Sequence, residues 1–335
     1  MSRKGLINLR SLPSLVTLGL FLLMFGAGSL SFPGFFSLQN FLNLFIDNAY
    51  LLVLAVGMTL VIVAGGIDLS VGSMLALSTM LSSFLLERAG WKPGQVIPTV
   101  LAVGLALGAF MGYMIHAFSL PPFIVTLAGL YLARGLCYVV SIDAIGIKNE
   151  FWQGMANARI PAEAANSVSP SVIIALAVVA AGGFILRSTK FGRTIYAIGG
   201  NEQSAVLMGL PVARTKVGIY AISGFCSALS GIVFSFYTLA GYALNGRGME
   251  MDAIATVVIG GTLLTGGVGG VVGTVFGVLV YGTIQVLIMF QGTLNSWWTR
   301  IAIGFLVFLF CLLQRVFEAG RGKSGKDGSA GPASC

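Results

Sequence analysis

The sequence predicts an all-α integral membrane protein with about ten transmembrane helices, and three observations support this fold class. Of the 335 residues, 56% are hydrophobic and only 9% are charged, whereas soluble domains contain about 25% charged residues. The chain also contains 46 glycines, which membrane helices tolerate because glycine permits close packing. Apolar runs of membrane-spanning length recur along the chain, so lipid must be the solvent for most of it.

A transmembrane helix needs about 20 predominantly apolar residues, and the chain offers ten such runs. The third and eighth runs are the least regular, because glycine, threonine and acidic residues interrupt them. We therefore expect broken or glycine-rich helices to line a central path. The expected spans cover residues 13–32, 41–64, 68–86, 96–117, 122–142, 170–187, 217–240, 252–268, 270–290 and 297–315.

Basic residues gather at the N-terminus, in the 187–216 segment and in the C-terminal tail. Positively charged loops stay cytoplasmic, and an even number of spans also places both termini and this loop inside the cell. Segment 143–163, with two basic and three acidic residues, suits the outer side. The expected organisation is a cytoplasmic segment (1–12), a transmembrane domain (13–316) and a Gly/Ser/Lys-rich tail (317–335) that we expect to be disordered.

The composition excludes several function classes. The net charge is +8, but no basic face is interleaved with aromatic residues, so we expect no nucleic-acid partner. Metal-ligand clusters and catalytic acid, base or nucleophile groupings are missing from the sequence pattern, which argues against an enzyme and against a bound cofactor. Gly322-Lys323-Ser324 resembles the end of a phosphate-binding loop, yet Phe317 stands where the loop requires glycine.

The stretch from Gly65 to Ser73 (GGIDLSVGS) interrupts a long apolar run. An acid at membrane depth costs about 2.5–3.5 kcal/mol on insertion scales, the glycines favour a break, and Ser70 is able to cap a new helix. Unwound backbone is tolerated in a membrane only when it is buried in protein or lines a cavity. Two interpretations are open: a broken helix beside a translocation path, or an acidic loop at the membrane surface with Asp68 as an N-cap.

Further candidate path residues are polar side chains in the other expected spans, where ionisable groups are functional candidates by default. Asp47 and Asn48 lie in the second span. Asp252 opens the eighth span, where a favourable interaction with the helix dipole is the alternative explanation. Thr262 and Thr265 lie in a run too small and polar to face lipid. Their hydroxyls are available to a polar solute or to their own backbone carbonyls.

Glycine repeats at every fourth residue in two places, one in each half of the chain. Such spacing leaves one helix face without side chains, so that backbones approach closely. Because a duplicated core is a common plan among transporters, we expect an internal pseudo-repeat. The two stripes are Gly104, Gly108 and Gly112, and Gly269, Gly273 and Gly277.

The cytoplasmic stretch 189–211 is long for a simple connection and mixes basic, aromatic and glycine residues. It contains a predicted short helix over 201–208 that closes at Gly209. The stretch is either a solvated basic loop or a docking element for a soluble partner, and docking explains its length better. The candidate docking residues are Arg193, Asn201, Glu202, Ala205 and Gly209.

As a set, the stretches 65–73, 189–211 and 250–270 resemble the signature segments of ribose-type sugar ABC permeases, and the similarity covers about residues 12–316. Glu202, Ala205 and Gly209 follow the usual docking motif of ABC importers only in part. Three other stretches look closest to the galactofuranose-transport permeases of that family. They are FIVTLAG (123–129), YTLAGYAL (237–244) and GTLNSWWT (292–299).

The resemblance implies a permease subunit in the bacterial inner membrane that works with a cytoplasmic ABC ATPase, a second permease subunit (identical or different) and a periplasmic sugar-binding protein. ATP is then bound and hydrolysed by the partner. A neutral, galactofuranose-like monosaccharide passes between the subunits by alternating access. Ribose, another pentose or a branched-chain amino acid are alternative substrates. An ion-coupled secondary transporter is the rival from another class, against which the scarcity of charges in the spans argues.

Overall fold

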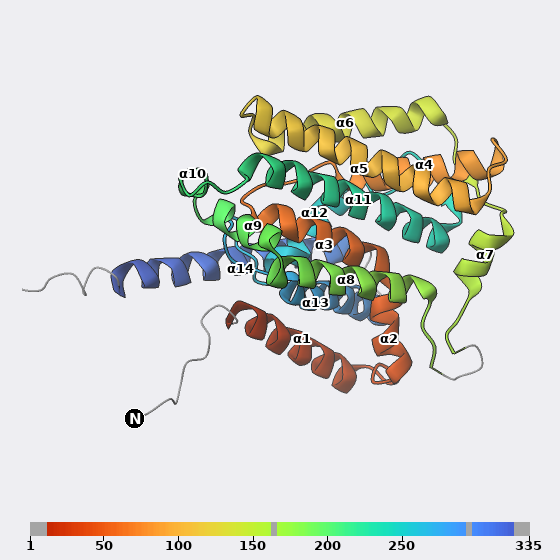
Figure 1. The fold of residues 1–335 in the computed structure, drawn as a ribbon. Coiled ribbons are helices and arrows are strands. Elements are labelled where there is room, and N and C mark those ends of the chain that lie inside the picture. The colour runs from red at the N-terminus through yellow and green to blue at the C-terminus, as the bar shows by residue number, and fades with distance from the viewer. Residues whose placement is uncertain (1–11, 162–165, 293–296, 325–335) are drawn as a thin grey trace, which may run out of the picture.

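In a computed structural model, described over residues 12–161, 166–292 and 297–324, the protein is a bundle of helices (Figure 1). Two short strands, β1 (Ile145–Gly146) and β2 (Ala240–Gly241), pair antiparallel. The helices of the described residues are α1 (Leu12–Ser31), α2 (Leu38–Asp47), α3 (Ala49–Val63), α4 (Val71–Glu87), α5 (Pro93–Ala117), α6 (Pro122–Val140), α7 (Glu150–Asn157), α8 (Pro170–Ser188), α9 (Lys190–Gly200), α10 (Glu202–Leu207), α11 (Val212–Thr238), α12 (Met249–Ile259), α13 (Val271–Gln291) and α14 (Trp297–Ser324).

Six of the described helices are long and apolar enough to cross a membrane: α1, α5, α6, α8, α11 and α13. Helices α2 and α3 form a pair bent by 57° that together has the length of a seventh span. Helix α4 and the first part of α14 are shorter apolar helices. The helical fold class is confirmed and these lengths fit an integral membrane protein, while the count of ten complete spans stays a prediction.

The expected eighth span, 252–268, is wrong in its extent. Helix α12 ends at Ile259, so it is only 11 residues or about 16 Å long, roughly half of a hydrocarbon core. Residues 260–270 are not helical. Positive φ angles explain the break, because four of these residues, all glycines, adopt a left-handed backbone that other residues rarely adopt: Gly261, Gly266, Gly267 and Gly269.

The ends of the chain differ in part from the expected domain limits. Helix α14 runs to Ser324, so it passes residue 317, where we expected disorder to begin. Residues 325–335 of that tail lie outside the described residues, as do residues 1–11 of the expected N-terminal segment.

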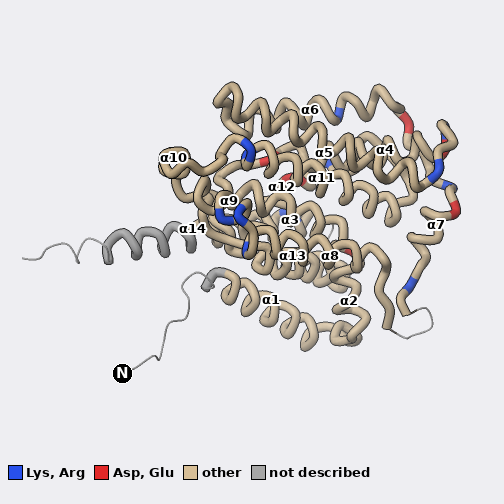
Figure 2. Tube along the Cα trace, in the orientation of Figure 1, with Lys and Arg blue, Asp and Glu red and all other residues tan. Residues whose placement is uncertain are grey.

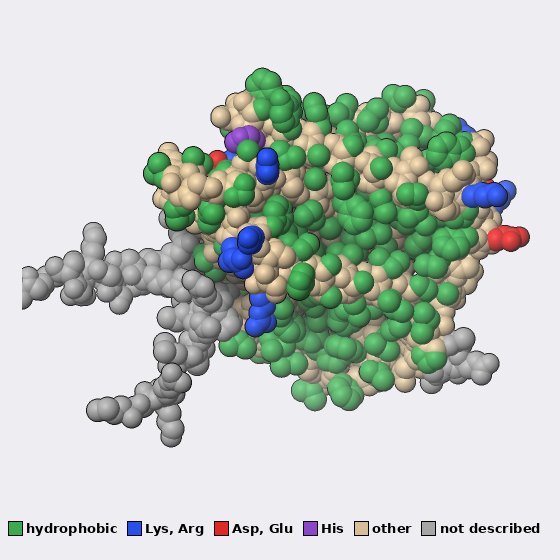
Figure 3. Space-filling view, viewed as in Figure 1, with side chains coloured by type: hydrophobic (Ala, Val, Ile, Leu, Met, Phe, Trp, Pro, Cys, Tyr) green, Lys and Arg blue, Asp and Glu red, His purple; other side chains and the backbone are tan. Residues whose placement is uncertain are grey.

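The bundle has two chemically different ends. Helices α9 and α10, the beginning of α1 and the end of α14 lie at one end, and α7 lies at the other (Figure 1). We call the first the basic end, because Arg187, Lys190, Arg193, Arg214 and Lys216 belong to its elements (Figure 2). The opposite end, here the α7 end, carries charges of both signs. Between the two ends, the visible face is dominated by apolar side chains (Figure 3), as a lipid-facing belt requires.

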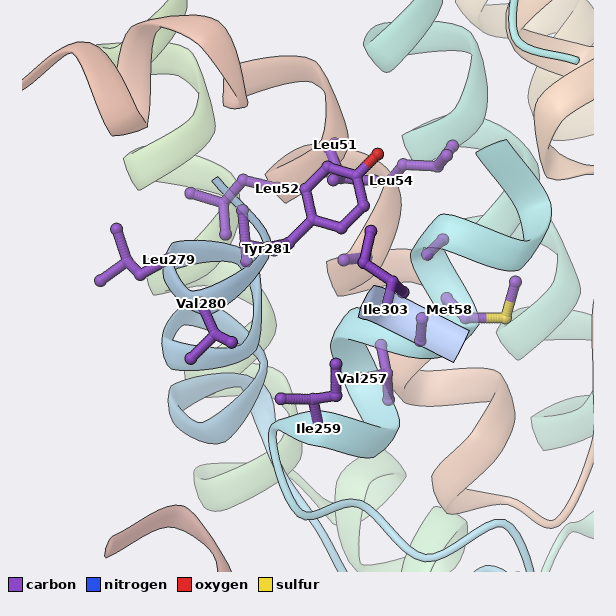
Figure 4. Packing of buried hydrophobic residues seen from close by; sticks show 14 of the residues in the cluster. Leu51, Leu52, Leu54, Met58, Val257, Ile259, Leu279, Val280, Tyr281 and Ile303 are labelled. Carbon is purple, nitrogen blue, oxygen red and sulfur yellow. The ribbon is translucent and has the colours of Figure 1, made fainter. Parts of the chain in front are cut away.

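Helix α11 occupies the centre of one half of the bundle, where it packs against α3, α4 and α5. The largest buried cluster joins α3 to the C-terminal helices (Figure 4). In that cluster Leu54 and Met58 of α3, Val257 of α12, Tyr281 of α13 and Ile303 of α14 are all buried. Helices far apart in sequence therefore share one core, so the chain folds as a single bundle.

Close backbone approach at the first glycine stripe is confirmed. A Cβ placed on Gly108 would strike the carbonyl of Tyr220 in α11, and Gly104 and Gly112 face the same helix. In the second stripe, Gly273 and Gly277 face the backbone of α12, while Gly269 precedes the helix. The two stripes thus pack on different partners, and the internal repeat stays a prediction.

Candidate functional site

The predicted path residues fall into three separate places. Asp68 and Ser70 lie in the turn between α3 and α4, where both are buried. Thr262 and Thr265 lie in the 260–270 break, near α9. The remaining residues, Asp47, Asn48 and Asp252, belong to the bend between α2 and α3 and to the first turn of α12.

Asp68 is an internal clamp between three elements. Its carboxylate accepts hydrogen bonds from the amide (2.9 Å) and hydroxyl (2.6 Å) of Ser70 and from the hydroxyl of Ser223 in α11 (2.7 Å). Thr126 in α6 donates to the neighbouring carbonyl of Ile67 at 3.2 Å. Asp68 is 1% exposed, so the segment is buried in protein, as unwound backbone in a membrane must be. The segment is therefore not an acidic loop at the membrane surface.

Four glycines, Gly65, Gly199, Gly266 and Gly267, form a second feature, which we call the glycine junction. The Gly267 amide donates to the carbonyl of Val63, the last residue of α3, at 2.8 Å. A Cβ on Gly199 of α9 would strike that carbonyl and come within 2.5 Å of the Gly267 nitrogen. The end of α3 and the 260–270 break therefore meet α9 at a point where only backbone fits.

The two threonines of the 260–270 break have different surroundings. Thr262 is fully buried and lies directly against Gly269, whereas Thr265 is exposed. The hydroxyl of Tyr196 in α9 donates to the carbonyl of Gly269 at 2.7 Å. This bond is a further tie between α9 and the break, and the spacing of the glycines alone did not indicate it.

Of the other three path candidates, Asp47 and Asp252 approach one another through Tyr50. Asp252 is hydrogen-bonded to Tyr281 in α13, and Asp47 and Asp252 both interact electrostatically with Tyr50. Asn48 lies at the bend between α2 and α3, where its side-chain amide donates to the carbonyl of Leu44 at 3.0 Å. Asn48 is therefore a structural residue of the bend, while Asp47 and Asp252 both lie near Tyr50.

The predicted docking segment is two helices rather than one. Asn201 caps α10 by accepting from the Ser204 amide at 2.7 Å, and Gly209 ends the turn with φ +72°, so the expected short helix is confirmed. Glu202 pairs with Lys216 at 2.6 Å. Ala205 is fully buried among Ile198, Val212 and their neighbours, so it holds α10 in place and offers no surface to a partner.

An exposed apolar surface lies on neighbouring residues that the sequence pattern did not single out. Val206, Leu207 and Met208 are exposed, Leu207 to 87%. Arg193 is also exposed and lines a basic groove between α9 and the start of α11, together with Lys190 and Arg214. We call Val206, Leu207 and Met208 the α10 patch.

Comparison with known proteins gives this geometry a context. The family described as "Branched-chain amino acid transport system / permease component" matches residues 40–311. The inner membrane ABC transporter permease protein YjfF of Escherichia coli is 48% identical over 91% of this chain and 92% of its own. The chain belongs to the ribose-type sugar ABC permease family. It is accordingly a transport component and not the ATP-hydrolysing one.

Two further relatives carry sugar names. The fructose import permease protein FruG of Bifidobacterium longum is 40% identical, with 95% of both chains covered. The ribose import permease protein RbsC of Bacillus subtilis is 37% identical, with 89% of this chain and 91% of its own covered. No solved structure matches.

Several residues of the sites were missed because their roles depend on contacts distant in sequence. Ser223 holds Asp68 from 155 positions away. Arg134 of α6 donates hydrogen bonds to two backbone carbonyls, those of Ala243 and Asn245, the latter at 2.8 Å. These bonds fix the loop before α12. The sequence offered one sign of this role of Arg134 in the permease: an arginine within an apolar run must find partners inside the protein.

We predict that Asp68→Ala destabilises this permease by about 2 kcal/mol or more, because it leaves buried donors of Ser70 and Ser223 without an acceptor. Asp68→Asn retains one acceptor oxygen and should cost less. Thermal unfolding of the detergent-solubilised protein measures the effect, with the exposed Asp143→Ala as the matched control. Equal melting of Asp68→Ala and Asp143→Ala would show that Asp68 is no clamp.

Proposed function

We propose that this chain is the membrane-spanning permease subunit of an ATP-driven importer in the bacterial inner membrane. Its cargo is a neutral monosaccharide, galactofuranose-like, which a periplasmic binding protein delivers. Two permease subunits and a cytoplasmic ABC ATPase complete the transporter. The names of the fructose and ribose permeases among the relatives support a sugar cargo.

The α10 patch is the observation that carries the proposal. Three exposed apolar side chains in a row at the basic end lie on a helix that is capped, ion-paired and packed. An ordered apolar patch next to basic residues is typical of a protein interface, and positively charged loops face the cytoplasm. A cytoplasmic partner such as the ATPase fits this surface.

The mechanism follows from what the patch is attached to. Helix α10 packs on α9 through the buried Ala205 and Ile198, and Gly199 of α9 lies in the glycine junction. A displacement of α10 by the partner therefore acts, through α9, on the end of α3 and on the 260–270 break. Ten membrane segments, four of them bent or shorter than a full span, would provide the two alternating arrangements.

Ion coupling is the less favoured mechanism. An ion relay needs an ionisable group that is free to exchange its partner inside the membrane. The most deeply buried acid, Asp68, is held by three donors. The proposal therefore assigns the energy source to ATP hydrolysis by the partner.

The test uses proteoliposomes that contain the permease, its ATPase and the loaded binding protein. We expect sugar uptake to require ATP on the ATPase side of the membrane and to persist when an ionophore collapses ion gradients. Labelled galactose, ribose and fructose, with leucine as the non-sugar probe, would identify the cargo class. Uptake that continues without the ATPase and stops with the ionophore would contradict the proposal, and so would uptake of leucine alone.

We predict that Leu207→Asp abolishes co-purification of the ATPase and reduces uptake at least tenfold, because a charge replaces the most exposed residue of the α10 patch. The neighbouring Gln203→Ala changes an exposed polar residue of the same helix and should have little effect. Normal melting of both variants would show that the fold is intact. Normal ATPase recovery with Leu207→Asp would place the docking surface elsewhere.

A further inference from the structure

A polar cavity lies within a single subunit, away from the Asp68 clamp and the glycine junction. Its volume is about 220 Å³, and its walls come from α2, α3, α7, α8, α11 and the segment before α8. The side chains that matter for its chemistry are Asn43, Asp47, Tyr50, Arg159, Ser169 and Tyr237. Of the path and docking residues described above, Asp47 is the one that lines this cavity.

The cavity contains polar groups that the protein itself leaves unused. Ser169 is 6% exposed, and its hydroxyl has no hydrogen-bond partner among the described residues. Leaving a buried hydroxyl unpaired costs about 1–3 kcal/mol. Among the described residues, the half-buried carboxylate of Asp47 likewise has no hydrogen-bond or ion-pair partner. A ligand able to donate and accept would satisfy both groups.

The charges of the lining favour a neutral ligand. Asp47 and Arg159 contribute one negative and one positive charge, so an anionic or cationic ligand would leave one charge unmatched. Arg159 donates from Nη1 to the carbonyls of Ala156 (3.1 Å) and Ala158 (3.0 Å). These bonds fix the guanidinium beside the cavity while other N–H donors of the fork remain for a ligand.

Aromatic side chains complete the site. Tyr50 and Tyr237 line the cavity along with Phe236, and the ring of Tyr50 is held edge-on against Phe234 at 4.9 Å between centroids. Rigid aromatic walls with a few convergent polar groups are typical of small-molecule sites. The volume is equivalent to roughly seven waters at about 30 Å³ each, which is the size class of one sugar ring.

From this combination we infer that the cavity at the α7 end binds a neutral monosaccharide within each permease subunit. The inference rests on the proposed function and deepens it. Asp47 and Ser169 bind sugar hydroxyls, Arg159 donates to a ring or hydroxyl oxygen, and the tyrosines cover the apolar face of the ring. The site would receive sugar at the outer entrance, separately from the path between subunits.

The test uses the assembled transporter, permease with ATPase, in nanodiscs without binding protein. Binding of labelled galactose, ribose and fructose is measured by scintillation proximity, with labelled leucine as the non-sugar probe. Asp47→Asn removes the charge, and Ala156→Leu fills the cavity from α7. Asp143→Asn, an exposed acid outside the cavity, is the matched control, and thermal melting reports folding of each variant.

We expect saturable binding of at least one sugar, weakened at least tenfold by Asp47→Asn and by Ala156→Leu and unchanged by Asp143→Asn. Equal affinity in all variants would overturn the site, as would binding of leucine in place of sugars. ATP-driven uptake by the same wild-type preparation separates the two proposals. Uptake without saturable sugar binding overturns the cavity alone, whereas failure of ATP-driven sugar uptake overturns both.

Discussion

The hydrogen bond from the Gly267 amide to the Val63 carbonyl, 2.8 Å long, joins the end of α3 to the 260–270 break that follows α12. In a membrane, backbone groups at a helix end have no water to pair with, so they must be satisfied within the protein. Here the Gly267 amide of the second break pairs with the Val63 carbonyl at the first, and the absence of side chains at the glycine junction lets α9 pack against the same point. The arrangement places α9 in direct contact with the core of the bundle.

This constraint explains why the polar residues are distributed as they are. The first break is stabilised on its other side by the Asp68 clamp, which ties it to α11. The second break is tied to α9 by the hydroxyl of Tyr196. The unsatisfied polar groups of the cavity gather instead at the α7 end, around Ser169 and Asp47. The groups of the cavity that are available to a ligand thus lie at the α7 end, away from the two breaks.

The sequence predicted those parts of the fold that depend on local composition. Apolar runs located most of the helices, and the stop at Gly209 and the break around Gly65 followed from glycine chemistry. The end of α12 was missed, because the apolar residues after Ile259 resemble a continuing span while positive φ at Gly261 ends it. Likewise Ala205 was assigned to docking because a sequence motif does not distinguish the buried face of a short helix from its exposed face. The α10 patch and the cavity depend on contacts between distant segments, which one sequence does not reveal.

In the proposed mechanism, α9 transmits movement from the docked partner to the two breaks through the glycine junction. Gly199→Ala adds a Cβ that strikes the Val63 carbonyl, whereas the neighbouring Gly200→Ala adds one into open space. The decisive measurement is ATP-driven uptake by each variant, with ATPase co-purification recorded on the same preparation. We expect Gly199→Ala to retain the ATPase but to lose at least tenfold in uptake, while Gly200→Ala behaves as wild type. Full uptake by Gly199→Ala would contradict it.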